Sequence, residues 1–271
     1  MRFFWTVGQA FVSNLIRRRA LLANLVVRDF KQRYVGSAAG WLWAVIHPAV
    51  LLLSYSFVFA AVFKVRPIPG SGTDSFVLYL FAGILPWLLF QETVQRSATT
   101  VLDHSNLITK TVFPSEVLPI SLFISGLLNH FLGLAVLLAM VAVLIKKITV
   151  FILLVPVYMV LLALFTIGVG WLVSSLNVFL RDTAQALSVI LTFWFWFTPI
   201  FFSAQNLPER VRFIARINPL AYVVEAYRNC LLAGRAPAPA DLGLTAAFAI
   251  VSFLAGGLFF RYTKRAFGDV L

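Results

Sequence analysis

Six apolar stretches, each about as long as a membrane-crossing helix, dominate this chain of 271 residues. A helix needs about 20 apolar residues to cross roughly 30 Å of hydrocarbon, because each residue adds only about 1.5 Å along its axis. The stretches are residues 38–63, 76–94, 117–145, 150–177, 183–202 and 242–261. They predict an all-α integral membrane protein whose six transmembrane helices form one domain, residues 38–261.

The composition excludes a soluble enzyme with a large core. Only 12% of the residues are charged and 61% are hydrophobic, whereas soluble domains carry about 25% charged residues. The single cysteine rules out an internal disulfide framework. The three histidines are His47, His104 and His130, and no two of them share a helix face, so we expect no metal site.

The distribution of basic residues predicts the orientation. Six crossings place both termini on one side of the membrane, and 13 of the 22 lysines and arginines belong to the segments on that side. Basic loops favour the cytoplasm. We therefore expect a cytoplasmic N-terminal segment, residues 1–37, and a cytoplasmic tail, residues 262–271. The N-terminus lacks the order and the cleavage site of a secretory signal.

The segment before the first span, LLANLVVRDFKQRYVGS, mixes apolar and basic residues. Leu22, Val26 and Phe30 recur at helical spacing, which is typical of an amphipathic helix lying in the membrane interface. A plain basic flank of the first span is the alternative. Asp29 and Arg33 are four residues apart in the favourable order for an ion pair within a helix.

The segment between the fifth and sixth spans predicts two short helices, within about 208–232. Pro208 and Pro219 suit the first position of each helix, and Asn218 suits the cap of the second. Neither helix is long enough to cross a bilayer. They would lie re-entrantly in the outer leaflet against the rest of the protein, or as amphipathic helices on the outer surface.

Three polar residues inside the predicted spans are candidates for function or for contacts between helices. Glu92 is a functional candidate because acids are rare in membrane helices, but Arg96 at i+4 offers an ion pair instead. Asn129 and His130 lie near the middle of the third span. They would either bond a neighbouring helix or face a water-filled path.

No motif for catalysis is present. GSGTDS at residues 70–75 lacks the spacing and the lysine of a phosphate-binding loop, and the ten acids are scattered. We therefore expect a chain that is not an enzyme and does not itself hydrolyse ATP.

Four motifs in register carry a resemblance: RDFKQRYVGSAAGWLWAVIHP, YLFAGILPW, SNLITKTVFPSEVLP and INPLAYVVEAYR. Nearly the whole chain resembles the membrane subunit of type-2 ABC exporters, most closely those exporting lipid-linked polysaccharide such as O-antigen, capsule or teichoic acid. The resemblance implies an interface helix, two gate helices containing Pro208, Pro219, Tyr222 and Tyr227, and a cytoplasmic coupling helix. The coupling helix would comprise Leu107, Ile108, Thr109, Lys110, Thr111, Val112 and Phe113; composition alone would also allow an ordinary loop there.

The run FWFWF, at Phe193 to Phe197, gains a use from this resemblance. Successive residues of a helix point about 100° apart, so the five rings spread around it and Trp194 and Trp196 cannot share one face. Phe193, Trp194, Trp196 and Phe197 are candidates for lining the path of a sugar polymer. An aromatic belt at the headgroup level is the alternative.

The resemblance also implies partners and a location. They are a homodimer in the bacterial inner membrane, two copies of a separate ATPase that binds ATP and Mg²⁺, and an undecaprenyl-pyrophosphate-linked glycan whose phosphates Arg28 and Arg33 would guide. No cofactor in this chain and no nucleic acid are expected. The alternatives are an exporter of a drug, peptide or small lipid, a membrane-embedded glycan transferase, and a structural scaffold.

Overall fold

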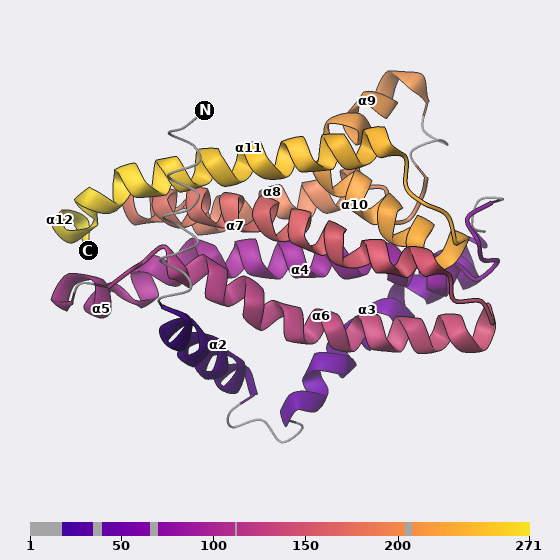
Figure 1. Ribbon diagram of the computed structural model, residues 1–271, viewed down its shortest axis with the longest axis horizontal. Helices are drawn as coiled ribbons and strands as arrows, with labels where there is room; N and C mark the ends of the chain where they lie inside the picture. The colour runs from indigo at the N-terminus through magenta and orange to yellow at the C-terminus, as the bar shows by residue number, and fades with distance from the viewer. Residues whose placement is uncertain (1–17, 35–39, 66–69, 112, 204–207) are drawn as a thin grey trace.

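The structure is a computed structural model that describes residues 18–34, 40–65, 70–111, 113–203 and 208–271. Within these ranges all regular secondary structure is helical. Figure 1 shows the long helices lying alongside one another, with short helices gathered at both ends of the bundle. Part of the predicted N-terminal segment and its boundary at residue 37 lie outside the described residues.

Four segments are long and apolar enough to cross a membrane: Phe76–Asp103, Val117–Leu144, Val150–Phe179 and Pro239–Ala266. They contain helices α4 (Phe76–Asp103), α6 (Val117–Leu144), α7 (Val155–Phe179) and α11 (Pro239–Thr263). Each coincides with a predicted span. Helix α4 is longer than its predicted span, because it continues past residue 94 to Asp103. No proline or glycine interrupts its polar last turns.

The other two predicted spans form shorter apolar helices. Helix α3, Trp43–Ser56, continues as a π-helical turn, Phe57–Val62. Helix α8, Thr183–Phe197, contains 15 residues and stops because Thr198 precedes a proline and is extended, with φ −83° and ψ 132°. By length the structure thus has four full spans and two shorter apolar helices among the described residues.

Helix α4 is the centre of the bundle. It packs against α6, α7 and α8, and its Trp87 and Phe90 rings are fully buried. Most of its apolar window is buried, whereas α6 and α11 each bury only a small share of theirs. Apolar surface left open on outer helices suits contact with lipid.

Helices α7 and α11 approach each other at two glycines. A Cβ on Gly256 would lie 2.0 Å from the carbonyl oxygen of Gly168, and one on Gly168 would lie 2.4 Å from the backbone of Ser252. The Ser252 hydroxyl donates to the Phe165 carbonyl at 3.0 Å. Small residues and a hydroxyl bond at close backbone contact are typical of membrane helix pairs.

Besides short 3-10 turns, the described residues contain further short helical elements. They are α2 (Arg19–Tyr34), α5 (Ser105–Lys110), α9 (Glu209–Ile217), α10 (Pro219–Arg228), a π-helical turn after α10 (Asn229–Ala233) and α12 (Phe267–Val270). Helices α5 and α12 lie together at one end of the bundle, called here the α5 end, while α9 lies at the other, the α9 end (Figure 1). Between the ends, α2 packs against α6.

Candidate functional site

A short helix forms where the coupling helix was expected, with different bounds. Helix α5 contains Leu107, Ile108, Thr109 and Lys110, but it begins at Ser105 and ends at Lys110. Thr111 is already extended, with φ −141° and ψ 160°. Phe113 lies beyond the helix, since a residue before proline avoids helical geometry, and Val112 lies outside the described residues.

Helix α5 is a continuation of α4 across a single residue. His104 separates the two helices, and its carbonyl accepts from the backbone amides of Leu107 at 3.0 Å and Ile108 at 3.1 Å. Its ring Nδ1 lies 2.9 Å from the Thr100 carbonyl of α4. A short connection with hydrogen bonds on both sides therefore joins α5 to α4.

Much of α5 remains accessible. Leu107, Thr109 and Lys110 are exposed, and Ile108 is half-buried against the core. Helix α12 packs against α5, and its Phe267 is fully buried. At the α5 end, the short helix α5 is therefore exposed on one side and packs against α12.

Helix α2 forms at the place expected for the interface helix. Leu22 and Val26 are half-buried, and Leu22 packs against the core. Arg28 and Lys31 are exposed. The apolar side of the helix therefore faces the bundle, and these two basic side chains point away from it.

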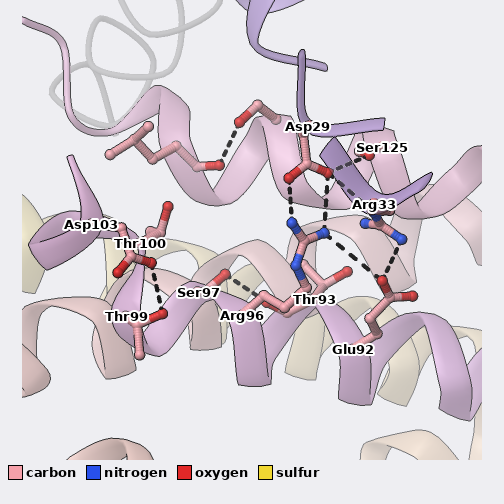
Figure 2. A network of polar contacts seen from close by, with 12 residues as sticks. Asp29, Arg33, Glu92, Thr93, Arg96, Ser97, Thr99, Thr100, Asp103 and Ser125 are labelled. Atoms are coloured by element: carbon pink, nitrogen blue, oxygen red, sulfur yellow. Dashed lines mark hydrogen bonds and ion pairs between the residues drawn. The ribbon is translucent and has the colours of Figure 1, made fainter. Parts of the chain in front are cut away.

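Four charged side chains, called here the α2–α4 charge cluster, join α2 to α4: Asp29, Arg33, Glu92 and Arg96. Asp29 Oδ2 accepts from Arg33 Nε at 3.2 Å and from Arg96 Nη1 at 3.1 Å, while Asp29 Oδ1 pairs with Arg96 Nη2. Glu92 pairs with Arg33 and lies 3.8 Å from Arg96 Nη1. Figure 2 shows these contacts converging between the two helices.

A hydroxyl from a third helix completes the cluster. Ser125 Oγ on α6 donates to Asp29 Oδ2 at 2.5 Å. Asp29 thus accepts bonds from Arg33, Arg96 and Ser125, and its side chain is only 14% exposed. A carboxylate with three donors is well compensated for its burial.

The pKa of Asp29 reflects this environment. Burial raises the pKa, but the hydrogen bonds from Arg96 and Ser125 and the positive charges of Arg96 and Arg33 outweigh burial and hold the pKa below its usual value of 3.8. Asp29 is therefore ionised at neutral pH. The cluster joins two acidic side chains to two basic ones.

The sequence indicated half of this arrangement. The pairs Asp29–Arg33 and Glu92–Arg96 are both visible as i, i+4 spacings, and both form. The bonds between the pairs were missed, because nothing local in the sequence brings α2 against α4. The available signal in the sequence was that both segments contain an acid and an arginine four residues apart, so that each could pair with the other.

The two arginines predicted to guide lipid phosphates have different surroundings. Arg28 is exposed. The Arg33 side chain is 13% exposed and holds Asp29 and Glu92. A phosphate could reach Arg28 without displacing a carboxylate, whereas at Arg33 it would have to compete with two.

The two predicted gate helices also differ from each other. In α10, Pro219 is the first residue and the Asn218 side chain accepts from the Leu220 amide at 3.1 Å, as the sequence predicted. In α9, Pro208 stands at the cap position, one residue before the helix, and not at its first position. Phe213 and Ile217 of α9 are exposed, whereas most of α10 is buried.

Polar contacts fasten α10 to the bundle. His130 Nε2 lies 3.0 Å from the Tyr227 hydroxyl, which joins α6 to α10. The Arg228 guanidinium donates to the carbonyls of Pro199 at 2.8 Å and Ile200 at 2.5 Å, and to that of Tyr79 at 3.3 Å. Because Arg228 is buried, these carbonyls replace its hydration shell.

Tyr222, the other predicted gate tyrosine, joins α10 to the end of α9. Its hydroxyl donates to the Arg216 carbonyl at 2.7 Å, and its ring stacks on Phe248 of α11. Helix α9 therefore connects to the bundle mainly through α10.

The aromatic run divides between two sides of α8. Phe193, Trp196 and Phe197 are 62%, 51% and 50% exposed. Trp194 is half-buried, and its Nε1 donates to Asn218 Oδ1 at 2.9 Å. Phe195 packs edge-on against Phe201, and Trp196, although half exposed, stacks on the same ring.

The described residues contain no group of three His, Cys, Asp or Glu side chains that could hold a metal ion. Glu116 pairs with Lys264 at 2.5 Å, and Glu225 lies 3.9 Å from Arg235. Like Asp29 and Glu92, these acids serve as partners for basic side chains.

Comparison with known proteins agrees with this architecture. The family model for the ABC-2 type transporter matches residues 20–232. The chain is 29% identical to an O-antigen export system permease protein of Myxococcus xanthus, over 95% of this chain and 98% of that protein. It is 30% identical to the protein of the same name in Klebsiella pneumoniae, over 79% and 81%.

A more distant relative has a different named cargo. A polysialic acid transport protein of Escherichia coli is 23% identical over 92% of this chain and 95% of its own length. The match of the family model covers helices α2 to α10, including the charge cluster, α5 and the aromatic run. This multi-helix membrane protein belongs to the ABC-2 type transporter family.

Proposed function

We propose that this chain is the permease subunit of an ABC exporter that carries lipid-linked polysaccharide, of the O-antigen or capsule kind, across a bacterial inner membrane. Two copies would form the path, and two copies of a separate subunit would bind ATP and Mg²⁺ and hydrolyse the ATP. The names of three similar proteins, two for O-antigen export and one for polysialic acid transport, support this cargo class.

The observation that carries the proposal is the junction of α4 and α5. An exposed short helix, bonded through His104 to the most buried helix of the bundle, suits the docking of a soluble motor. Movement of the ATPase would displace α5, and α4 would carry the displacement into the membrane. Leu107, Thr109 and Lys110 are the exposed residues proposed to meet the ATPase.

We further propose that α3 and α8 also cross the membrane, which gives six crossings and two cytoplasmic termini. Their apolar parts, Ile46–Val62 and Thr183–Phe197, are shorter than the four long spans. A short helix is accommodated by local thinning of the bilayer or by contact with a second subunit. Labelling of single cysteines from each side of the membrane tests this topology.

The exposed side of α8 is the proposed surface for the polymer. Phe193, Trp196 and Phe197 share this side, and rings without a fixed hydrogen-bond pattern would let many sugars slide past. Trp194 has a structural role in this proposal, because its indole donates a hydrogen bond to Asn218, the cap residue of α10. A headgroup belt predicts that the same three rings affect membrane insertion, not export.

Residues that were predicted to act together receive different roles at the entrance and at the exit of the transport path. Exposed Arg28 would attract the pyrophosphate of the lipid, while Arg33 remains with its carboxylates. At the far end α9 would move as the gate, carrying Pro208, whereas α10, with Pro219, Tyr222 and Tyr227, would act as its fixed base.

Deletion of the gene tests the proposal. Undecaprenyl-linked glycan should accumulate on the cytoplasmic side, and surface polysaccharide should disappear. A plasmid copy with its ATPase should restore export, and the two proteins should co-purify as a complex that hydrolyses ATP. Unchanged surface glycan together with a new sensitivity to a drug would point instead to an exporter of small molecules.

A further inference from the structure

The α2–α4 charge cluster connects α2, the helix predicted to lie at the membrane interface, to the helix that leads into α5. Asp29 and Arg33 come from α2, and Glu92 and Arg96 come from α4. Arg96 lies two helical turns before the end of α4 at Asp103, so the cluster is close to the α4–α5 junction. The cluster therefore lies nearer to α5 along the chain than most of α4 does.

The apolar contacts of α2 are directed elsewhere. Helix α2 packs mainly against α6, and Val27, beside the cluster, is exposed. The ion pairs and hydrogen bonds of the cluster join α2 to α4. These charged contacts hold the two helices in a defined geometry, because they fix both separation and rotation.

The geometry points to a mechanical role: we propose that the α2–α4 charge cluster is a clasp that makes the interface helix α2 move as one body with α4 and α5 during transport. The inference rests on the proposed function, since it assumes that an ATPase acts on α5. Asp29, Arg33, Glu92 and Arg96 act as positioning residues, and none of them needs to touch the cargo. Release of the clasp would leave ATP hydrolysis running without coordinated movement of α2.

The arrangement of signs allows a clean test. Each helix carries one acid and one arginine four residues apart. Inverting both on α2, with Asp29→Arg and Arg33→Asp, keeps the pair within the helix and the net charge of the protein. It places like charges across the helix interface. Inverting both on α4, with Glu92→Arg and Arg96→Glu, does the same from the other side.

Combining the four substitutions restores opposite charges across the interface, with one arginine and one carboxylate in each pair. We expect each two-residue inversion to lower export about tenfold, while ATP turnover by the complex changes less than about twofold, and we expect the combination to recover most of the loss. Lys31→Gln, an exposed site on the same helix, is the matched control and should export normally.

A distance measurement tests the movement itself. Spin labels at two exposed positions, Asn24→Cys on α2 and Asp103→Cys on α4, would be placed in a Cys230→Ala background. The clasp predicts the same distance distribution with and without ATP, and a broader one in the α2 inversion. A shift of the mean between the two nucleotide states in an export-competent protein would overturn the proposal.

The outcomes separate this inference from the proposed function. An unsubstituted complex that exports no glycan contradicts the proposed function. Normal export with either two-residue inversion, or no recovery with the four-residue combination in a complex that still assembles, contradicts the clasp. Should the inversions prevent assembly, Asp29→Asn is the milder variant to use. It must then lower export while ATP turnover stays nearly unchanged.

Discussion

Arg96 donates to Asp29 across 67 positions of sequence, with 3.1 Å between Nη1 and Oδ2. Arg33 and Ser125 bond the same carboxylate oxygen. One acid on α2 thereby receives bonds from its own helix, from α4 and from α6. Loss of that single charge should loosen three helices together.

Asp29→Asn should lower stability and change its dependence on pH. Each hydrogen bond to a charged group contributes about 1.5–3 kcal/mol. Because the folded pKa of Asp29 lies below 3.8, the carboxylate stabilises the fold at any pH above that value, and the contribution is lost as pH falls through the folded pKa. Thermal unfolding in detergent should show a larger gap between wild type and variant at pH 7 than at a pH below 3.8. A gap of the same size at both pH values would contradict this assignment.

Gly256→Val should separate α7 from α11. The added atoms would collide with the backbone of Gly168, which cannot turn aside as a flexible side chain does, and overpacking of this kind costs about 1–3 kcal/mol or more. The melting temperature of the purified protein should fall. Gly243→Ala is the matched control on the same helix, because a Cβ there meets nothing within 4 Å, and it should be neutral or slightly stabilising.

Arg228→Leu should be among the most damaging substitutions at the α9 end. Three carbonyls lose their donor, and unsatisfied buried acceptors cost about 1–3 kcal/mol each. We expect low yield of folded protein, measured by size-exclusion chromatography after detergent extraction. Arg235→Gln, at a side chain 56% exposed, should remain monodisperse; equal loss in both variants would mean that charge, not burial, matters here.

Two tryptophans of α8 should behave differently. Trp196→Ala removes an exposed ring and should reduce export while the protein stays folded, whereas Trp194→Ala breaks the bond to Asn218 and should lower the melting temperature. The pair of measurements, surface glycan per cell and thermal stability, distinguishes the two roles. A fall in stability at both positions would argue against a polymer surface on α8.

The sequence was most informative where structure follows from nearby residues. The apolar stretches located the long helices, and Asn218 with Pro219 located the start of α10. It was less informative about where a short helix ends. Helix α5 ends at Lys110 because the chain before Pro114 becomes extended. The meeting of Asp29 with Arg96, and of His130 with Tyr227, depends on how distant helices pack, and no local pattern encodes that.

The enclosure of Arg228 changes how the basic residues of the chain should be counted. The sequence places it in a loop on the side opposite the termini, where it would weigh against a cytoplasmic N-terminus. Its charge faces peptide carbonyls and the ring of Tyr79, 3.7 Å away, so it cannot exchange contacts with phospholipid headgroups. A tally of loop charges should therefore leave Arg228 out, and an arginine in a short buried helix should be scored as part of the interior.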